Sequence, residues 1–137
     1  MTETEFLEAF ERCSLPEDQW THAAHVRMAW LYLQRIPLSE AIPVVRDGIK
    51  RYNASLKKTL AYHETITQVF LQLISHRMQH SGGHQSFTDF CIENADLLDR
   101  NMTALLIYYR KETLFSQAAS EAFVKPDLEI LQNTPDG

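Results

Sequence analysis

Apolar side chains recur at every third or fourth residue along most of the chain, and this spacing constrains the fold more than any other feature. In an α-helix, residues three and four apart lie on one face, so the spacing predicts amphipathic helices that pack through apolar stripes. Alternating β-branched residues, which would indicate strands, are scarce, and only 4 glycines occur in 137 residues. The sequence therefore predicts an all-α fold, a single-domain bundle of about six to seven helices.

Capping residues and helix breakers divide this pattern into separate helices. Thr21 is suited to cap the second helix, and Pro37 ends it because proline lacks the N–H group that continues a helix. The Ser-Gly-Gly sequence at 81–83 ends the fourth helix. We expect residues 1–128 to form one domain and residues 129–137 to form a loose tail. The predicted helices cover, approximately, residues 3–12, 21–35, 39–53, 62–79, 87–92, 97–109 and 116–123.

Charge and cysteine content argue against several classes of partner. With 13 basic and 18 acidic side chains, the formal net charge is −5, which argues against nucleic acid or an anionic membrane surface as a partner. The acidic N-terminus lacks the pattern of a signal peptide, and the longest apolar run, residues 28–33, is too short to span a membrane. Cys13 and Cys91 form no Cys-x-x-Cys pair, so we expect a cytoplasmic protein with reduced thiols. Its apolar surface can support a homodimer.

Three of the six histidines lie in two motifs, Trp-Thr-His-Ala-Ala-His and Tyr-His-Glu-Thr-Ile-Thr. His22 and His25 are three residues apart, so both lie on the face that carries the apolar stripe of the second helix. His63 precedes a similar stripe, and Glu64 follows it directly. If the two helix starts meet, three imidazoles and one carboxylate converge at one end of the bundle, and bundle interiors are a recurrent place for metal sites.

A divalent transition metal is the predicted occupant of this site, because imidazole and carboxylate groups together suit Fe, Mn, Zn, Ni or Cu. Glu64 can instead act as a general base, with Thr67 and Tyr109 contacting a small polar substrate, so these three are the expected catalytic residues. Under this hypothesis the protein is a small-molecule metalloenzyme. The expected metal ligands are His22, His25, His63 and Glu64.

Two other hypotheses fit the same residues. The first is a metal-free pocket that binds a small anion at the positive helix N-termini, or that uses His63 and Glu64 as an acid–base pair. The second is a structural or partner-binding helical protein whose histidines form a buried hydrogen-bond network. The spacing does not choose among the three, since His-x-x-His is far less specific than His-Glu-x-x-His.

The remaining histidines, His76, His80 and His84, are spaced by four residues near the end of a predicted helix. Side chains four residues apart on a helix can bind a metal together, but histidines are also favoured at the negative C-terminal end of the helix dipole. The Ser-Gly-Gly break interrupts the group before His84. We therefore expect a solvated surface here rather than a site.

The two motifs, together with a late Phe-Val-Lys-Pro-Asp segment, resemble a widespread family of small uncharacterised bacterial proteins. That family combines an aromatic residue and Thr before His-x-x-His, a Tyr-His-Glu-Thr-Ile-Thr block, a tyrosine-rich stretch and Phe-Val-x-Pro-Asp. The resemblance spans residues 5–128 and implies no established activity. Arg110 stands where the family pattern has serine, which argues against a direct role for this position, and Ala61 stands where it has glycine or lysine. The signature positions that the resemblance implies are His22, His25, His63, Glu64, Thr65 and Thr67.

Overall fold

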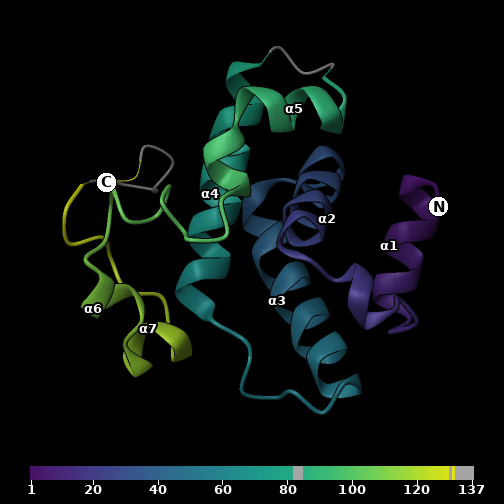
Figure 1. Cartoon of the computed structure of the whole chain (residues 1–137), viewed down its shortest axis with the longest axis horizontal. Coiled ribbons are helices and arrows are strands. Elements are labelled where there is room, and N and C mark those ends of the chain that lie inside the picture. The colour runs from purple at the N-terminus through teal and green to yellow at the C-terminus, as the bar shows by residue number, and fades with distance from the viewer. Residues whose placement is uncertain (82–84, 130, 132–137) are drawn as a thin grey trace. The chain divides into compact units, whose positions relative to one another are not determined.

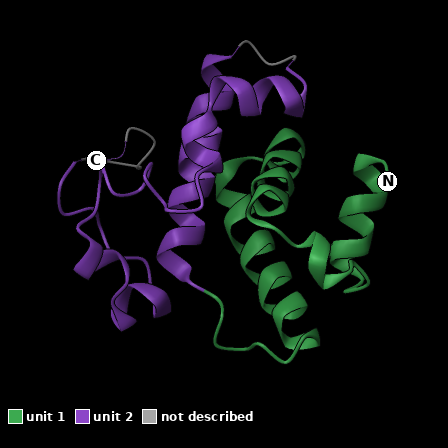
Figure 2. Ribbon diagram, in the orientation of Figure 1, with its two compact units in different colours: residues 1–62 green, residues 63–137 purple. Residues whose placement is uncertain are grey.

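Residues 1–81, 85–129 and 131 are described in the computed structural model of the chain (Figure 1). Over these residues the chain forms seven α-helices and two short 3-10 helices, with no β-strand. The predicted all-α class and the predicted number of helices are therefore confirmed. The chain divides into two compact units, residues 1–62 and 63–137, which Figure 2 shows in different colours. The predicted single domain over residues 1–128 stays a prediction.

Unit 1 contains three α-helices joined by short connections. Its elements are α1 (Glu3–Glu11), η1 (Glu17–Gln19), α2 (His22–Arg35) and α3 (Leu38–Ser55). Thr2 begins α1 with a capping box, in which its hydroxyl accepts a hydrogen bond from the Glu5 amide and its own amide donates to the Glu5 carboxylate. Helix α3 continues through Pro43. Each of the three helices packs against the other two.

The core of unit 1 is built around the ring of Phe10 on α1, which is fully buried. This ring stacks on Trp20 at a centroid distance of 4.9 Å and lies 5.8 Å from the ring of Tyr52. The Tyr52 hydroxyl donates a 2.7 Å hydrogen bond to the carbonyl of Leu15, which ties α3 to the loop after α1. Helix α1 approaches α3 closely because the facing residue is Gly48, where a Cβ atom would lie 2.9 Å from the Phe10 ring.

Unit 2 is organised around its longest helix, α4 (Glu64–His80). Its other elements are α5 (Phe87–Glu93), η2 (Ala95–Leu98), α6 (Lys111–Leu114) and α7 (Gln117–Glu121). Helix α7 packs against both α4 and α6, and α5 contacts η2. The hydroxyls of Ser86 and Ser116 cap α5 and α7 by accepting the amide hydrogen bond of the residue three positions later.

The predicted helix over residues 97–109 is wrong. After η2 the chain makes a series of turns through this span. The Asp99 carboxylate accepts hydrogen bonds from the Asn101 amide at 2.9 Å and from the Thr103 hydroxyl at 2.7 Å. Met102 has a φ of 63°, in the left-handed region, which is incompatible with a continuous helix. The Asp99 side chain therefore competes with helical hydrogen bonding at the start of this span, and apolar spacing does not reveal this competition.

Part of the predicted loose tail is described. Within it, the side chain of Leu131 is buried, with 2 % of its surface exposed. Residues 130 and 132–137 lie outside the described residues, as does His84. Across the part of the chain that the structure describes, no helix combines the length and apolar character needed to cross a membrane.

Replacing Gly48 by alanine should destabilise the protein, because the new Cβ would overlap the buried Phe10 ring. Overpacking typically costs about 1–3 kcal/mol, and the higher helix propensity of alanine offsets about 1 kcal/mol of this. We expect the free energy of unfolding, measured by urea denaturation, to fall by about 1 kcal/mol. The same change should cost less in a Phe10→Leu background, and equal costs in both backgrounds would contradict the close contact.

Candidate functional site

The first histidine motif forms the start of α2. Thr21 caps this helix, as predicted, because its hydroxyl accepts a 3.2 Å hydrogen bond from the Ala24 amide. His22 is the first residue of the helix and is half-buried. The ring of His25 packs on Trp20 at a centroid distance of 3.8 Å, and its Nδ1 lies 2.7 Å from the carbonyl oxygen of Thr21. Since a carbonyl only accepts, Nδ1 carries a proton, and Nε2 is the atom suited to bind a ligand.

The surroundings of His25 disfavour its charged form. Burial lowers the pKa of His25 below its ordinary value, the hydrogen bond to the Thr21 carbonyl acts in the opposite direction, and His22 lowers the pKa further. A neutral imidazole is the form that binds a metal, so this environment suits the predicted ligand role. It suits a stacked aromatic residue of the core equally well.

His63 is the N-cap residue of α4, and both of its ring nitrogens are hydrogen-bonded within unit 2. Its Nδ1 accepts the Ile66 amide at 3.1 Å, and its Nε2 lies 2.8 Å from the carbonyl oxygen of Leu114. These partners place a proton on Nε2 and the lone pair on Nδ1. His63 thus joins the start of α4 to the end of α6, and a metal bound here would have to replace one of these hydrogen bonds.

Thr65 holds the chain that follows α7 against α4. Its side chain is fully buried, and its hydroxyl donates to the Ala122 carbonyl at 2.9 Å and accepts the Val124 amide at 3.1 Å. The buried Tyr109 hydroxyl donates to the Val124 carbonyl at 2.5 Å. Burial and the nearby Asp127 carboxylate raise the pKa of Tyr109, so this hydroxyl keeps its proton. We call the contacts of Thr65 and Tyr109 with this segment the C-terminal latch.

Glu64 and Thr67 lie in the first turns of α4. Glu64 is 6 % exposed, and its carboxylate accepts a 2.5 Å hydrogen bond from the Gln68 side chain. The Thr67 hydroxyl donates to the His63 carbonyl at 2.8 Å. The hydroxyl protons of Thr67 and Tyr109 are therefore engaged by backbone carbonyls and do not face a substrate as donors. The catalytic role of Glu64, Thr67 and Tyr109 stays a prediction.

The predicted metal ligands are distributed over both units. His22 and His25 belong to unit 1, whereas His63 and Glu64 belong to unit 2. Among the residues that the structure describes, no group of three or more His, Cys, Asp or Glu side chains is arranged to hold a metal ion. The convergence of the two motifs on one metal stays a prediction.

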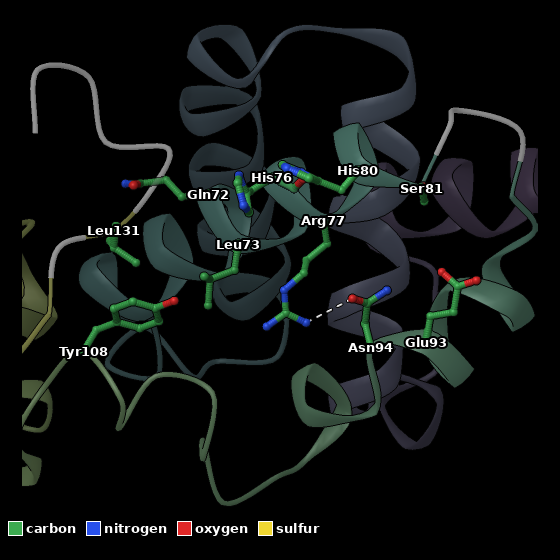
Figure 3. A pocket seen from close by; sticks show the side chains of 10 residues that line it. All are labelled: Gln72, Leu73, His76, Arg77, His80, Ser81, Glu93, Asn94, Tyr108 and Leu131. Atoms are coloured by element: carbon green, nitrogen blue, oxygen red, sulfur yellow. Dashed lines mark hydrogen bonds between the residues drawn. The ribbon is translucent and has the colours of Figure 1, made fainter.

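Unit 2 contains a pocket that was not predicted from the sequence, and most of its lining residues carry polar side chains (Figure 3). Its volume is about 340 Å³, and it lies along the second half of α4. All but two of its lining residues carry polar side chains. The lining residues are Gln72, Leu73, His76, Arg77, His80, Ser81, Glu93, Asn94, Tyr108 and Leu131.

A sequence signal for this pocket exists. Gln72, His76 and His80 are spaced by four residues, so they form a polar stripe along one face of α4. The two histidines were expected at a solvated surface. His80 is exposed, but His76 is half-buried, and both line the pocket.

Arg77 fixes one wall of the pocket. Its guanidinium donates two parallel hydrogen bonds to the Asp96 carboxylate at 2.9 and 2.8 Å, and a third to the Asn94 side chain at 3.0 Å, dashed in Figure 3. This pairing raises the pKa of Arg77 and lowers the pKa of Asp96. Asn94 is held in turn by donating to the Phe90 carbonyl at 2.9 Å. Bidentate geometry gives such a wall a defined shape before any ligand arrives.

The charges around the pocket favour neutral or cationic ligands over anions. The positive charge of Arg77 is paired with Asp96, and Glu93 adds an exposed carboxylate to the lining. The pocket also extends to the last turn of α4, where the helix dipole is negative.

Replacing His63 by alanine should destabilise the protein, because α4 loses its cap and the Leu114 carbonyl loses its donor. A lost cap costs about 1 kcal/mol and an unpaired buried carbonyl about 1–3 kcal/mol, so we expect the free energy of unfolding to fall by about 2 kcal/mol in urea denaturation. His63→Asn can still cap the helix and should recover about half of this loss. The exposed His80→Ala is the control, with an expected change within about 0.5 kcal/mol.

Metal content of the same purified proteins, measured by inductively coupled plasma mass spectrometry, separates the cap from the predicted metal site. If the role of His63 is to cap α4, the parent and the folded His63→Asn variant should contain equal metal. Near-stoichiometric metal in the parent that disappears in this variant would instead support ligation by His63.

The lowered pKa of His25 should make stability depend on pH. Below its ordinary pKa of about 6.5, the unfolded chain takes up a proton at this residue that the folded chain resists. The contribution of His25 to the free energy of unfolding is therefore complete above about pH 6.5 and decreases as the pH falls below that value. Between about pH 7.5 and about pH 5.5, His25→Gln should lose less stability than the parent in urea denaturation. Equal losses would contradict burial as the cause.

Comparison of the chain with protein-family models, with curated proteins and with solved structures gives no match. The resemblance to a family of small bacterial proteins therefore stays a prediction that the two motifs carry.

Proposed function

We propose that the protein binds a small polar molecule, neutral or cationic, in the pocket along α4 of unit 2. The observation that carries the proposal is the lining, because polar side chains from α4, from the end of α5 and from the turns before α6 converge on a space of about 340 Å³. Ligand sites typically occupy about 300–1,000 Å³, so this volume suits a small molecule. A ligand with several hydrogen-bonding groups matches such a lining better than an apolar one does.

The fixed wall of the pocket supports this proposal. The Arg77 fork is already bonded to Asp96 and Asn94, so a ligand does not have to order these side chains on binding. Ordering a long side chain costs about 0.5–1.5 kcal/mol, and a preformed wall avoids this cost.

The second histidine motif acquires a positioning role in this proposal. The carbonyl of Tyr108, whose side chain lines the pocket, accepts a 2.9 Å hydrogen bond from the Leu128 amide. The preceding part of the same segment is held by the C-terminal latch, through Thr65 and Tyr109. Residues at the start of α4 thus hold the segment that bonds Tyr108, and the side chain of Tyr108 forms part of the pocket near the end of α4.

The choice of a neutral or cationic ligand rests on charge. Arg77 is paired and Glu93 is exposed beside the pocket, so an anion would meet one carboxylate and the negative end of α4 without an unpaired guanidinium to bind it. An amine or a polyol would not meet this repulsion.

Glycerol, serinol and glycerate test the proposal, since they have similar size but are neutral, cationic and anionic. In two-dimensional amide NMR titrations, we expect saturable shifts at Leu73, Ser81 and Tyr108, and weaker binding of glycerate than of the other two. Glu93→Gln should weaken serinol binding by about twofold to fivefold, the size of an exposed charge interaction, and leave glycerol binding unchanged.

Glu112→Gln is the matched control, because Glu112 is an exposed carboxylate of α6 that does not line the pocket. It should leave the affinity of all three probes unchanged. The absence of saturable shifts with every probe, or shifts that map away from the pocket, would overturn the proposal.

A further inference from the structure

His76 and His80 lie one helical turn apart on the face of α4 that lines the pocket, and their rings lie side by side (Figure 3). The ring centroids are 4.3 Å apart, and the ring planes are inclined by 51°. Two imidazoles that bind one metal ion through nitrogens at about 2.0–2.1 Å have ring centres about 4.5–5 Å apart. The pair is therefore close to the separation that chelation requires before any side chain moves.

The hydrogen bonding of His80 leaves one nitrogen suited to a metal. Its Nδ1 lies 2.9 Å from the carbonyl oxygen of His76. Since a carbonyl only accepts, Nδ1 carries the proton and Nε2 keeps its lone pair. Metal-binding histidines commonly donate their other nitrogen to a backbone carbonyl in this way, which fixes the orientation of the ring. His80 is exposed and His76 is half-buried, so an ion can reach the pair from solvent.

The charges around the pair favour a cation. Both histidines lie in the C-terminal part of α4, where the helix dipole is negative, and Glu93 lines the same pocket. Arg77 directs its guanidinium toward Asn94, away from the two imidazole rings (Figure 3). Its charge is paired with Asp96, which reduces its repulsion of a bound ion.

We propose that His76 and His80 bind one divalent transition metal ion through their imidazole nitrogens, with water as the remaining ligands. With two imidazole ligands from the protein, the ion binds reversibly. The site binds Cu²⁺ more tightly than Ni²⁺ or Zn²⁺, in the general order for imidazole ligands. It goes beyond the proposed function, since it requires no organic ligand.

Isothermal titration calorimetry of the untagged full chain with nickel chloride tests this site, alongside thermal unfolding at each metal concentration. We expect one Ni²⁺ bound per chain, and a rise in Tm with Ni²⁺ because the ion binds the folded state. His76→Asn and His80→Asn should each weaken Ni²⁺ binding by at least about tenfold, since losing even an outer-shell partner costs about 10–100-fold, and should reduce the rise in Tm.

His22→Asn and His63→Asn are the matched controls, since each removes one imidazole from a signature motif, and circular dichroism verifies that every variant is folded. Both should bind Ni²⁺ as the parent does. Binding that survives in the His76→Asn/His80→Asn double variant would overturn the proposal, and its loss in either control would assign the metal to the motifs. The calorimetry contains no organic probe, so failure of serinol or glycerol to bind bears on the proposed function alone.

Discussion

The buried hydroxyl of Thr65 is the interaction on which the architecture of unit 2 depends. One hydroxyl satisfies two backbone groups, the Ala122 carbonyl and the Val124 amide, in a segment with no regular secondary structure of its own. Leaving a buried backbone group without a partner lowers stability by about 1–3 kcal/mol. Because the Thr65 hydroxyl both donates and accepts, it avoids this cost for two groups of the segment. A valine of the same shape would satisfy neither group.

The same physical requirement explains much of the Tyr-His-Glu-Thr-Ile-Thr motif. A helix begins with amide groups that have no partner in the helix, and His63 accepts one of them while its other nitrogen reaches the Leu114 carbonyl. Thr67 bonds the carbonyl of His63. The polar residues of this motif resemble a reactive site. In these contacts, however, they begin α4 and hold α6 and the segment after α7 against it. Glu64, buried and bonded to Gln68, is the member of the motif with a carboxylate.

The two ends of α4 consequently have different roles. The first turns hold backbone segments, whereas the second half presents a polar stripe to a pocket whose other walls come from α5 and from the turns before α6. The latch connects the two roles, because it secures the segment that bonds the backbone of Tyr108. Under the proposed function, binding beside the second half of α4 would depend on hydrogen bonds made at its first turns.

Features that depend on a few neighbouring residues were predictable from the sequence alone: the all-α class and the start of α2 at Thr21. Caps and apolar spacing act over one or two helical turns, so the local sequence determines them. Only the tertiary structure decided the partners of Thr65, which lie 57 and 59 residues away, and the pocket around Arg77. It also decided that turns replace the predicted helix over residues 97–109. These features depend on which distant segments of the chain come into contact. Apolar spacing does not show which buried polar groups will need a hydrogen-bond partner once those segments are packed together.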